Sequence, residues 1–106
     1  MDIEKVTIEV PVQKFEVYHK DCKFKLEHDD AAKYCKGLGD GWRLPTRKEQ
    51  LEMHEHKEEL GLKGYYWSSA EYDLNNAWFY CFYSGFSVTL NKSNTYRVRA
   101  VRTIKD

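Results

Sequence analysis

The segment that decides the fold of this chain is YYWSSAEYDLNNAWFYCFYSGFSVTLN, residues 65–91. It is rich in aromatic and β-branched residues, which favour strands. Ser84-Gly85 separates two such runs, Ala77–Tyr83 and Phe86–Asn91, and a short loop containing glycine predicts a β-hairpin. We also predict a shorter strand over residues 66–69, before the hairpin, and a final strand over residues 96–103.

The strand predicted over residues 77–83 is apolar on both faces. Side chains alternate along a strand, so Tyr80 points to one face while Phe79, Cys81 and Tyr83 point to the other. A domain of this size has little material with which to cover both faces. We therefore expect one aromatic face to lie in water, and such a patch usually marks an interaction site. The alternative is that both faces belong to the core.

Two helices are predicted upstream of this segment. The first has apolar residues at i, i+4 and i+7 on one face, namely Ala31, Cys35 and Leu38. Asp29 or Asp30 is expected to cap its start, and Gly37 or Gly39 is expected to end it. The sequence therefore predicts one short helix that packs a narrow stripe against the core.

The second helix begins with a capping box, Thr46-Arg47-Lys48-Glu49. In this motif the Thr hydroxyl accepts from the Glu backbone N–H, and the Glu carboxylate reaches back to the Thr N–H. We predict a helix from Arg47 to the late fifties, after which Gly61 and Gly64 return the chain to an extended conformation.

Three extended pieces are predicted before the helices, and their apolar residues alternate with polar ones: Val6, Ile8, Val10 and Val12; Phe15 and Val17; Cys22, Phe24 and Leu26. Pro11 has no backbone donor, so its end of the first strand should lie at a sheet edge. The order is strands, two helices, then strands, which is typical of the α+β class. The length of 106 residues fits a single domain over residues 1–106.

The overall charge is balanced, with 17 Lys and Arg against 17 Asp and Glu, so we expect no nucleic-acid partner. The start of the chain, Met1–Lys5, carries charge without an apolar run, which predicts no signal peptide. No stretch is long enough to span a membrane. We therefore expect the protein in the cytoplasm or in a phage particle.

Neither a catalytic centre nor a metal site is predicted. The three cysteines, Cys22, Cys35 and Cys81, lack C-x-x-C spacing and are expected to be buried, reduced thiols. His54 and His56 are two residues apart, so on a helix they point about 200° apart and cannot share an ion. The sequence thus predicts no enzyme, no metal and no cofactor.

Several phrases resemble one known family. In chain order they are Gly41-Trp42-Arg43-Leu44-Pro45-Thr46, Tyr66-Trp67-Ser68-Ser69-Ala70-Glu71, Asn76-Ala77-Trp78, Gly85, Lys92 and Arg99-Ala100-Val101-Arg102. Over residues 29–103 the chain resembles the C-type-lectin-fold domains of bacteria and phages, in particular the DUF1566 family, which is also found at the C-terminus of a collagen-like adhesin. This resemblance implies a C-type-lectin-like fold, with two helices flanking small antiparallel sheets. Calcium-dependent sugar binding is not expected, because the motifs for it are absent.

Within that family, the chain resembles the variable proteins of diversity-generating retroelements. Trp78, Phe82, Gly85, Lys92 and residues 98–102 look like the fixed frame, which Trp42 and Trp67 would help to hold. The resemblance implies a ligand-binding surface made by the residues between these positions and by the preceding loop. The predicted binding residues are Tyr72, Asp73, Asn75, Phe79, Cys81, Tyr83, Ser84, Phe86, Val88, Leu90, Asn91, Ser93, Asn94 and Tyr96.

The expected function is recognition of a protein or glycan on a cell surface, and a homo-oligomer is compatible with it. The alternative is a structural, assembly or adhesin-type subunit of a phage or bacterium. A third reading, an enzyme of the formylglycine-generating type, is disfavoured because Cys81 has no second cysteine near it in the C-terminal segment. Arg97, Arg99 and Arg102 could bind an anionic ligand, but the resemblance favours carboxylate pairs for the last two, for instance with Glu71.

Overall fold

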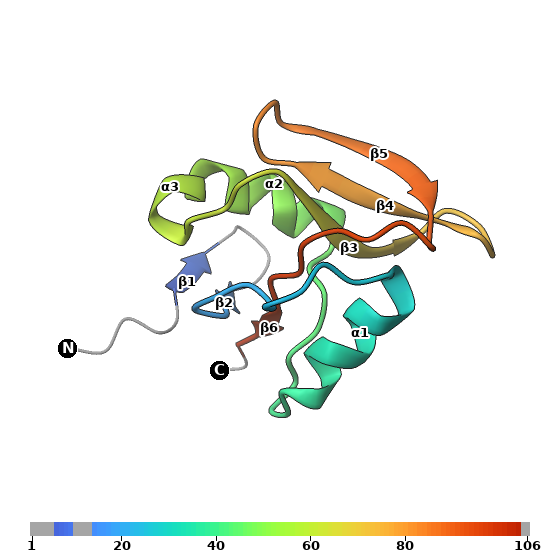
Figure 1. The fold of residues 1–106 in the computed structure, drawn as a ribbon. Helices are drawn as coiled ribbons and strands as arrows, with labels where there is room; N and C mark the ends of the chain where they lie inside the picture. Colours follow the sequence, from blue (N-terminus) through green and yellow to red (C-terminus); the bar gives the residue numbers. More distant parts are fainter. Residues whose placement is uncertain (1–5, 10–13, 105–106) are drawn as a thin grey trace.

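The computed structural model describes residues 6–9 and 14–104 (Figure 1). Along the chain the elements are β1 (Val6–Glu9), β2 (Lys14–Val17), α1 (His28–Gly37), α2 (Arg47–Glu55), α3 (Lys57–Leu60), β3 (Tyr65–Glu71), β4 (Asn76–Cys81), β5 (Phe86–Asn91) and β6 (Val101–Thr103). The predicted α+β class is confirmed. Val10, Pro11 and Val12 lie outside the described residues.

The first sheet joins the two ends of the domain. Its strand order is β1-β2-β6, and both pairings are antiparallel. Phe15 and Val17 of β2 are fully buried, and they pair with Thr103 and Val101 of β6. The short extended piece predicted at Phe15 and Val17 is therefore correct, and it holds the C-terminal strand in place.

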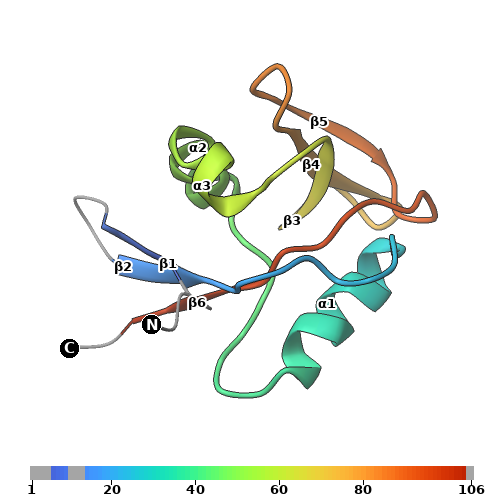
Figure 2. The same cartoon turned by 60° about the vertical axis from the view of Figure 1, so that its left-hand side comes forward.

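The second sheet carries the predicted hairpin. Its order is β3-β4-β5, all antiparallel, with an irregularity in β3 between Trp67 and Glu71. Gly85 has φ +79° in the turn between β4 and β5, a conformation that favours glycine. In Figure 2, α2 and α3 lie beside this sheet, and the segment before β6 runs between the sheet and α1.

The capping box is present as predicted. The Thr46 hydroxyl accepts from the Glu49 N–H at 3.1 Å, and the Glu49 carboxylate accepts from the Thr46 N–H at 2.9 Å. The predicted single second helix is interrupted at His56, where ψ is 16° and α2 gives way to α3. Gly61 then ends α3 with φ +70°, as its left-handed preference predicts.

The start of α1 differs from the prediction. Glu27 occupies the N-cap position and makes no side-chain capping bond, while Asp29 and Asp30 lie in the first turn. There they stabilise the helix through its dipole, because negative charge is favoured near a helix N-terminus. Periodicity located the helix correctly but placed its cap two or three residues too late.

Two predicted strands are wrong in extent. Residues 22–26 form no strand; only Leu26 makes a bridge, with Tyr96. The predicted final strand over residues 96–103 is regular only at β6. Its earlier part instead bonds to three neighbours, since Tyr96 pairs with Leu26, Arg97 accepts from Trp67, and Val98 accepts from Cys22. A segment shared among several neighbours cannot form one continuous ladder.

The core consists of two apolar clusters, which contact opposite faces of β3 and β4. One joins the first sheet, α2 and α3 to one face: Phe15, Val17, Met53, Leu60, Leu62, Tyr66, Tyr80, Phe82 and Val101. The other joins α1 and the segment before β6 to the opposite face: Ala31, Cys35, Trp42, Leu44, Trp67, Ala77, Phe79, Val98 and Ala100. Both faces of β4 are therefore core, which is the alternative that the sequence left open.

Candidate binding surface

Neither core cluster contains a residue of strand β5. Its apolar side chains are half exposed, with exposed fractions of 48% for Phe86, 37% for Val88 and 41% for Leu90. The register pairs them with Cys81, Phe79 and Ala77 of β4, respectively. Residues paired across a ladder share a face of the sheet. The exposed apolar side chains of β5 therefore lie next to the buried apolar side chains of β4, on the same face.

Phe79 and Cys81 do not lie in water, contrary to the expectation of an exposed face on β4. Phe79 is 6% exposed and Cys81 is 2% exposed. Phe79 belongs to the core cluster made with α1 and the segment before β6, and Tyr96 of that segment stacks on its ring. The prediction of an exposed apolar face on β4 is therefore wrong, and the exposed apolar row lies one strand further out, on β5.

Aromatic rings support the inner side of this row. Tyr96 stacks on Phe79 with ring centroids 4.7 Å apart, and Tyr65 meets both rings edge-on at 5.5 and 5.9 Å. Tyr65 is itself 44% exposed. We define the apolar ledge as Tyr65, Phe86, Val88, Leu90 and Tyr96. Three of these side chains lie on β5, and the two tyrosines are held by ring contacts with Phe79.

One end of the ledge is polar. The β3–β4 loop meets the segment after β5, where the Lys92 N–H donates to the Asn75 carbonyl at 2.9 Å. A cavity of about 260 Å³ opens here, lined by Glu27, Asp29, Leu74, Asn75, Asn91, Lys92 and Ser93. Three of the predicted binding residues, Asn75, Asn91 and Ser93, are thus brought together at one hollow. Leu74, which the sequence did not suggest, is 86% exposed at its rim.

Asp73 shapes this loop. Its Oδ1 accepts from the N–H groups of Asn75 and Asn76 at 2.9 and 2.8 Å, and these bonds hold the pKa of its carboxyl below the usual range. Because its carboxylate accepts hydrogen bonds from Asn75 and Asn76, Asp73 holds the loop in shape and thereby positions Asn75. The neighbouring Tyr72 is 64% exposed and meets Trp78 edge-on, on the face away from the ledge.

The opposite end of the ledge is the β4–β5 turn. Tyr83 is 68% exposed there, and the Ser84 hydroxyl donates to the Cys81 sulfur at 3.3 Å. Most of the predicted binding residues therefore fall into the ledge, its loop end or its turn end, whereas Phe79 and Cys81 are buried and Tyr72 lies on the opposite face. A ladder of six residues separates the two ends by about 17 Å.

The arginines of the frame make carboxylate pairs. Arg99 Nε donates to Asp21 at 2.8 Å, and Arg102 Nε donates to Glu16 at 2.7 Å. The structural role predicted for both is thus supported, but the suggested partner Glu71 is wrong, because Glu71 pairs with Lys92.

The remaining frame positions also carry contacts within the fold. Arg43 forms a two-bond pair with Glu49. Trp42 and Trp67 are buried, whereas Trp78 is half-buried beneath the Arg47 guanidinium, 3.5 Å from the ring centroid.

Residues 13–102 match the family model described as Lcl C-terminal domain. The chain belongs to the Lcl C-terminal domain family. This is a DUF1566-like family, so that part of the resemblance is confirmed. No curated protein sequence matches the chain.

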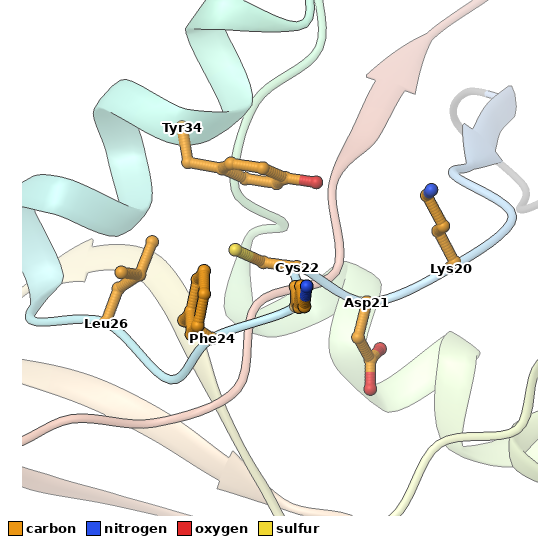
Figure 3. Close-up of a pocket in the computed structure, with 7 residues that line it drawn as sticks. Lys20, Asp21, Cys22, Phe24, Leu26 and Tyr34 are labelled. Carbon is orange, nitrogen blue, oxygen red and sulfur yellow. The ribbon is translucent and has the colours of Figure 1, made fainter.

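A second hollow in this Lcl C-terminal domain lies where a strand was wrongly predicted. Its volume is about 660 Å³, and it is lined by Lys20, Asp21, Cys22, Lys23, Phe24, Leu26 and Tyr34. Figure 3 shows the Tyr34 ring above the Cys22 thiol, with Phe24 and Leu26 beside them. Alternation could not reveal this hollow, because it depends on residues 22–26 leaving the sheet and passing under α1.

The described residues of this family member contain no group of three or more His, Cys, Asp or Glu side chains able to hold a metal ion. His54 packs against Tyr80 and Phe82, and His56 bonds to Glu59 at 2.8 Å, so the two histidines serve different neighbours. Every helix in the described part of the chain is too short or too polar to cross a membrane.

Proposed function

We propose that this domain recognises a protein or glycan on a cell surface, and that the apolar ledge and its polar loop end are the contact surface. The observation that carries the proposal is the row Phe86, Val88 and Leu90, exposed side by side on one face of β5. Folded monomers seldom leave a continuous apolar row in water without a partner for it.

The support beneath the ledge suits recognition. Tyr65 and Tyr96 are tied to Phe79 by ring contacts, so they lose little conformational freedom when a partner docks. Large, stiff aromatic groups beside short polar ones are typical of binding surfaces that discriminate between partners. At the loop end, Asn75, Asn91 and Ser93 supply such polar groups around a hollow.

We also propose that the domain has a C-type-lectin-like fold and works on a bacterial surface or in a phage. A C-type-lectin-like fold is supported by the β2–β6 pairing, which closes the two ends of the domain, with α1, α2 and a second sheet between them. Membership of the Lcl C-terminal domain family supports a surface or phage-related setting. An experimental structure superposed on C-type lectins would test the fold directly.

A second proposal is that a diversity-generating retroelement varies the exposed residues of the ledge and so changes which ligand it binds. It is favoured because the exposed positions on β5 lie between buried frame residues, Phe82 before the strand and Val98 and Ala100 after it. Sequencing the locus in several isolates tests it. A reverse-transcriptase gene and a near-copy of the segment encoding residues 66–102, differing at template adenines, would support it; an unchanging segment would remove it.

We further propose that the domain is not an enzyme. Its buried Glu49 and Arg99 serve the frame, because Glu49 bonds to Arg43 and Arg99 bonds to Asp21. Cys35 is buried, and burial together with nearby Cys22 raises its pKa to about 12, so its thiol stays protonated at neutral pH.

The binding proposal is tested with a glycan array and a panel of intact bacterial cells as probes. Val88→Ser and Leu90→Ser should reduce binding about tenfold or more, since truncating anchors at the centre of an interface costs over 1 kcal/mol. Leu51→Ser is the matched control, because Leu51 is 56% exposed on α2, away from the ledge. Equal binding by all three variants would contradict the proposal.

A further inference from the structure

Strand β5 is the outer edge of its sheet. The order β3-β4-β5 leaves one side of β5 without a neighbouring strand among the described residues, and Figure 1 shows it at the outer edge of the molecule. Such an edge presents a row of unpaired peptide groups, to which another strand can add.

The direction of these peptide groups follows from the register. The Lys92 N–H donates toward β4, to Asn75, and the pairing continues without a shift from Asn76–Asn91 to Cys81–Phe86. Peptide groups alternate in direction along an antiparallel strand. Those of Phe86, Val88 and Leu90 therefore point to β4, and those of Ser87 and Thr89 point to the free edge.

The usual protections of an edge strand are absent from β5. Its sequence, Phe-Ser-Val-Thr-Leu-Asn, has no charged residue and no proline, and its ladder with β4 has no bulge. Edge strands of monomeric proteins are normally blunted by one of these devices. An uncharged edge also allows two identical strands to meet without repulsion between like charges.

We propose that β5 pairs antiparallel with β5 of a second copy of this chain, about a two-fold axis at Val88. Ser87 then lies opposite the partner's Thr89, and each such pair exchanges both of its N–H···O=C bonds through the outward peptide groups. Phe86 lies opposite the partner's Leu90, and Val88 lies opposite the partner's Val88. All three apolar side chains of the ledge strand thus meet apolar partners on the same face.

The neighbouring register is less favourable. An axis at Thr89 would place Phe86 opposite the partner's Lys92, and Lys92 is already paired with Glu71 within its own copy. Of these two registers, only the axis at Val88 places each of Phe86, Val88 and Leu90 opposite an apolar residue of the partner. This symmetric match singles out a second copy as the occupant, because the same short sequence supplies both halves of the contact.

The dimer extends the ledge rather than covering it. The two sheets become one sheet of six strands, and the two ledges join across Val88 on a single face. Pairing through six-residue edges is small against the 1,200–2,000 Å² of a standard interface, so the dimer should dissociate at roughly micromolar concentration. The inference goes beyond ligand recognition, since it does not require a ligand.

Cysteine cross-linking tests the register. Opposed residues at a site without ladder bonds have Cα atoms about 4.5 Å apart, which a disulfide can span. Val88→Cys should therefore form a covalent dimer under mild oxidation, in a Cys22→Ser background that removes the more accessible native thiol. Thr89→Cys is the matched control, because the two copies of Thr89 would be about 8–9 Å apart, beyond disulfide reach. Cross-linking of Thr89→Cys and not Val88→Cys would overturn the proposed register.

Sedimentation equilibrium from about 1 to 500 µM tests the edge without cysteine. The wild type should shift from monomer to dimer across this range. Thr89→Pro removes an outward N–H while leaving the ladder with β4 intact, so it should weaken dimerisation at least tenfold. Thr89→Val keeps the N–H and should dimerise like the wild type. A wild type that stays monomeric throughout, or a dimer unaffected by Thr89→Pro in a variant that remains folded by circular dichroism, refutes the inference.

Discussion

The ring of Tyr96 stacks on the ring of Phe79, with centroids 4.7 Å apart and planes inclined by 18°. This contact joins the segment before β6 to the centre of the second sheet, and Trp67 meets Tyr96 edge-on at 5.0 Å in the same cluster. Tyr96 thus both borders the ledge and holds a returning segment of chain against the core. Its stability role was not expected from the sequence, which assigned it to binding alone.

Tyr96→Ala should lower the free energy of unfolding by about 2 kcal/mol, because it removes three ring contacts and half-buried area. Tyr83→Ala is the control, since Tyr83 is 68% exposed and its loss should change stability by less than about 0.5 kcal/mol. Urea denaturation of both variants measures the difference. Equal stability of the two would show that the stacked geometry contributes little.

Trp67→Ala should be the most damaging single truncation of the second sheet. Trp67 is fully buried, and its indole N–H donates to the Leu26 carbonyl at 2.8 Å. We expect a loss of about 3–5 kcal/mol in the free energy of unfolding. Trp78→Ala should cost clearly less, because Trp78 is only half-buried and loses mainly its contacts with Arg47 and the exposed Tyr72. Thermal unfolding monitored by circular dichroism would order the two.

Asp21 is the acceptor at the centre of a polar network. Its two carboxylate oxygens accept from Tyr66 and Arg99, each at 2.8 Å. Asp21→Ala should destabilise the protein by about 3 kcal/mol, because Arg99, which is 4% exposed, would be left buried without its carboxylate. Asp30→Ala, at an exposed position of α1, serves as the control. A comparable loss in both variants would contradict the network.

Glu49 should make the stability depend on acid pH. Burial opposes its charge, but the hydrogen bonds from Arg43 and Thr46 outweigh burial and lower its pKa. The pKa is lower in the folded state than in the unfolded state, so this contribution is present above about pH 4.5 and is lost as pH falls through the folded value. Urea denaturation at neutral and acid pH measures the loss. Glu49→Gln should be less stable at neutral pH and should show a smaller decline in acid; an equal decline would exclude Glu49 as a cause.

Local chemistry accounts for the elements that the sequence predicted correctly. The capping box at Thr46 and Glu49 satisfies its own donors within one turn, and Gly85 supplies the left-handed conformation in the hairpin turn. The predicted strand over residues 77–83 ends at Cys81, because the turn spans residues 82–85 rather than Ser84-Gly85 alone. Where an element depends on distant partners, the prediction failed. Cys22 and Leu26 alternate like a strand, but their backbone donors go singly to Val98 and Tyr96.

By itself, the sequence determined the α+β class, the hairpin, the capped helix and the family, because these depend on periodicity and on residues close in the chain. Only the tertiary structure decided which strand of the hairpin faces water. Phe79 on β4 and Val88 on β5 are both apolar and share one face, yet one is 6% and the other 37% exposed. The difference arises because α1 and the segment around Tyr96 cover β4 and stop short of β5. Alternation specifies the face of a side chain, whereas the packing of other elements specifies whether that face is covered.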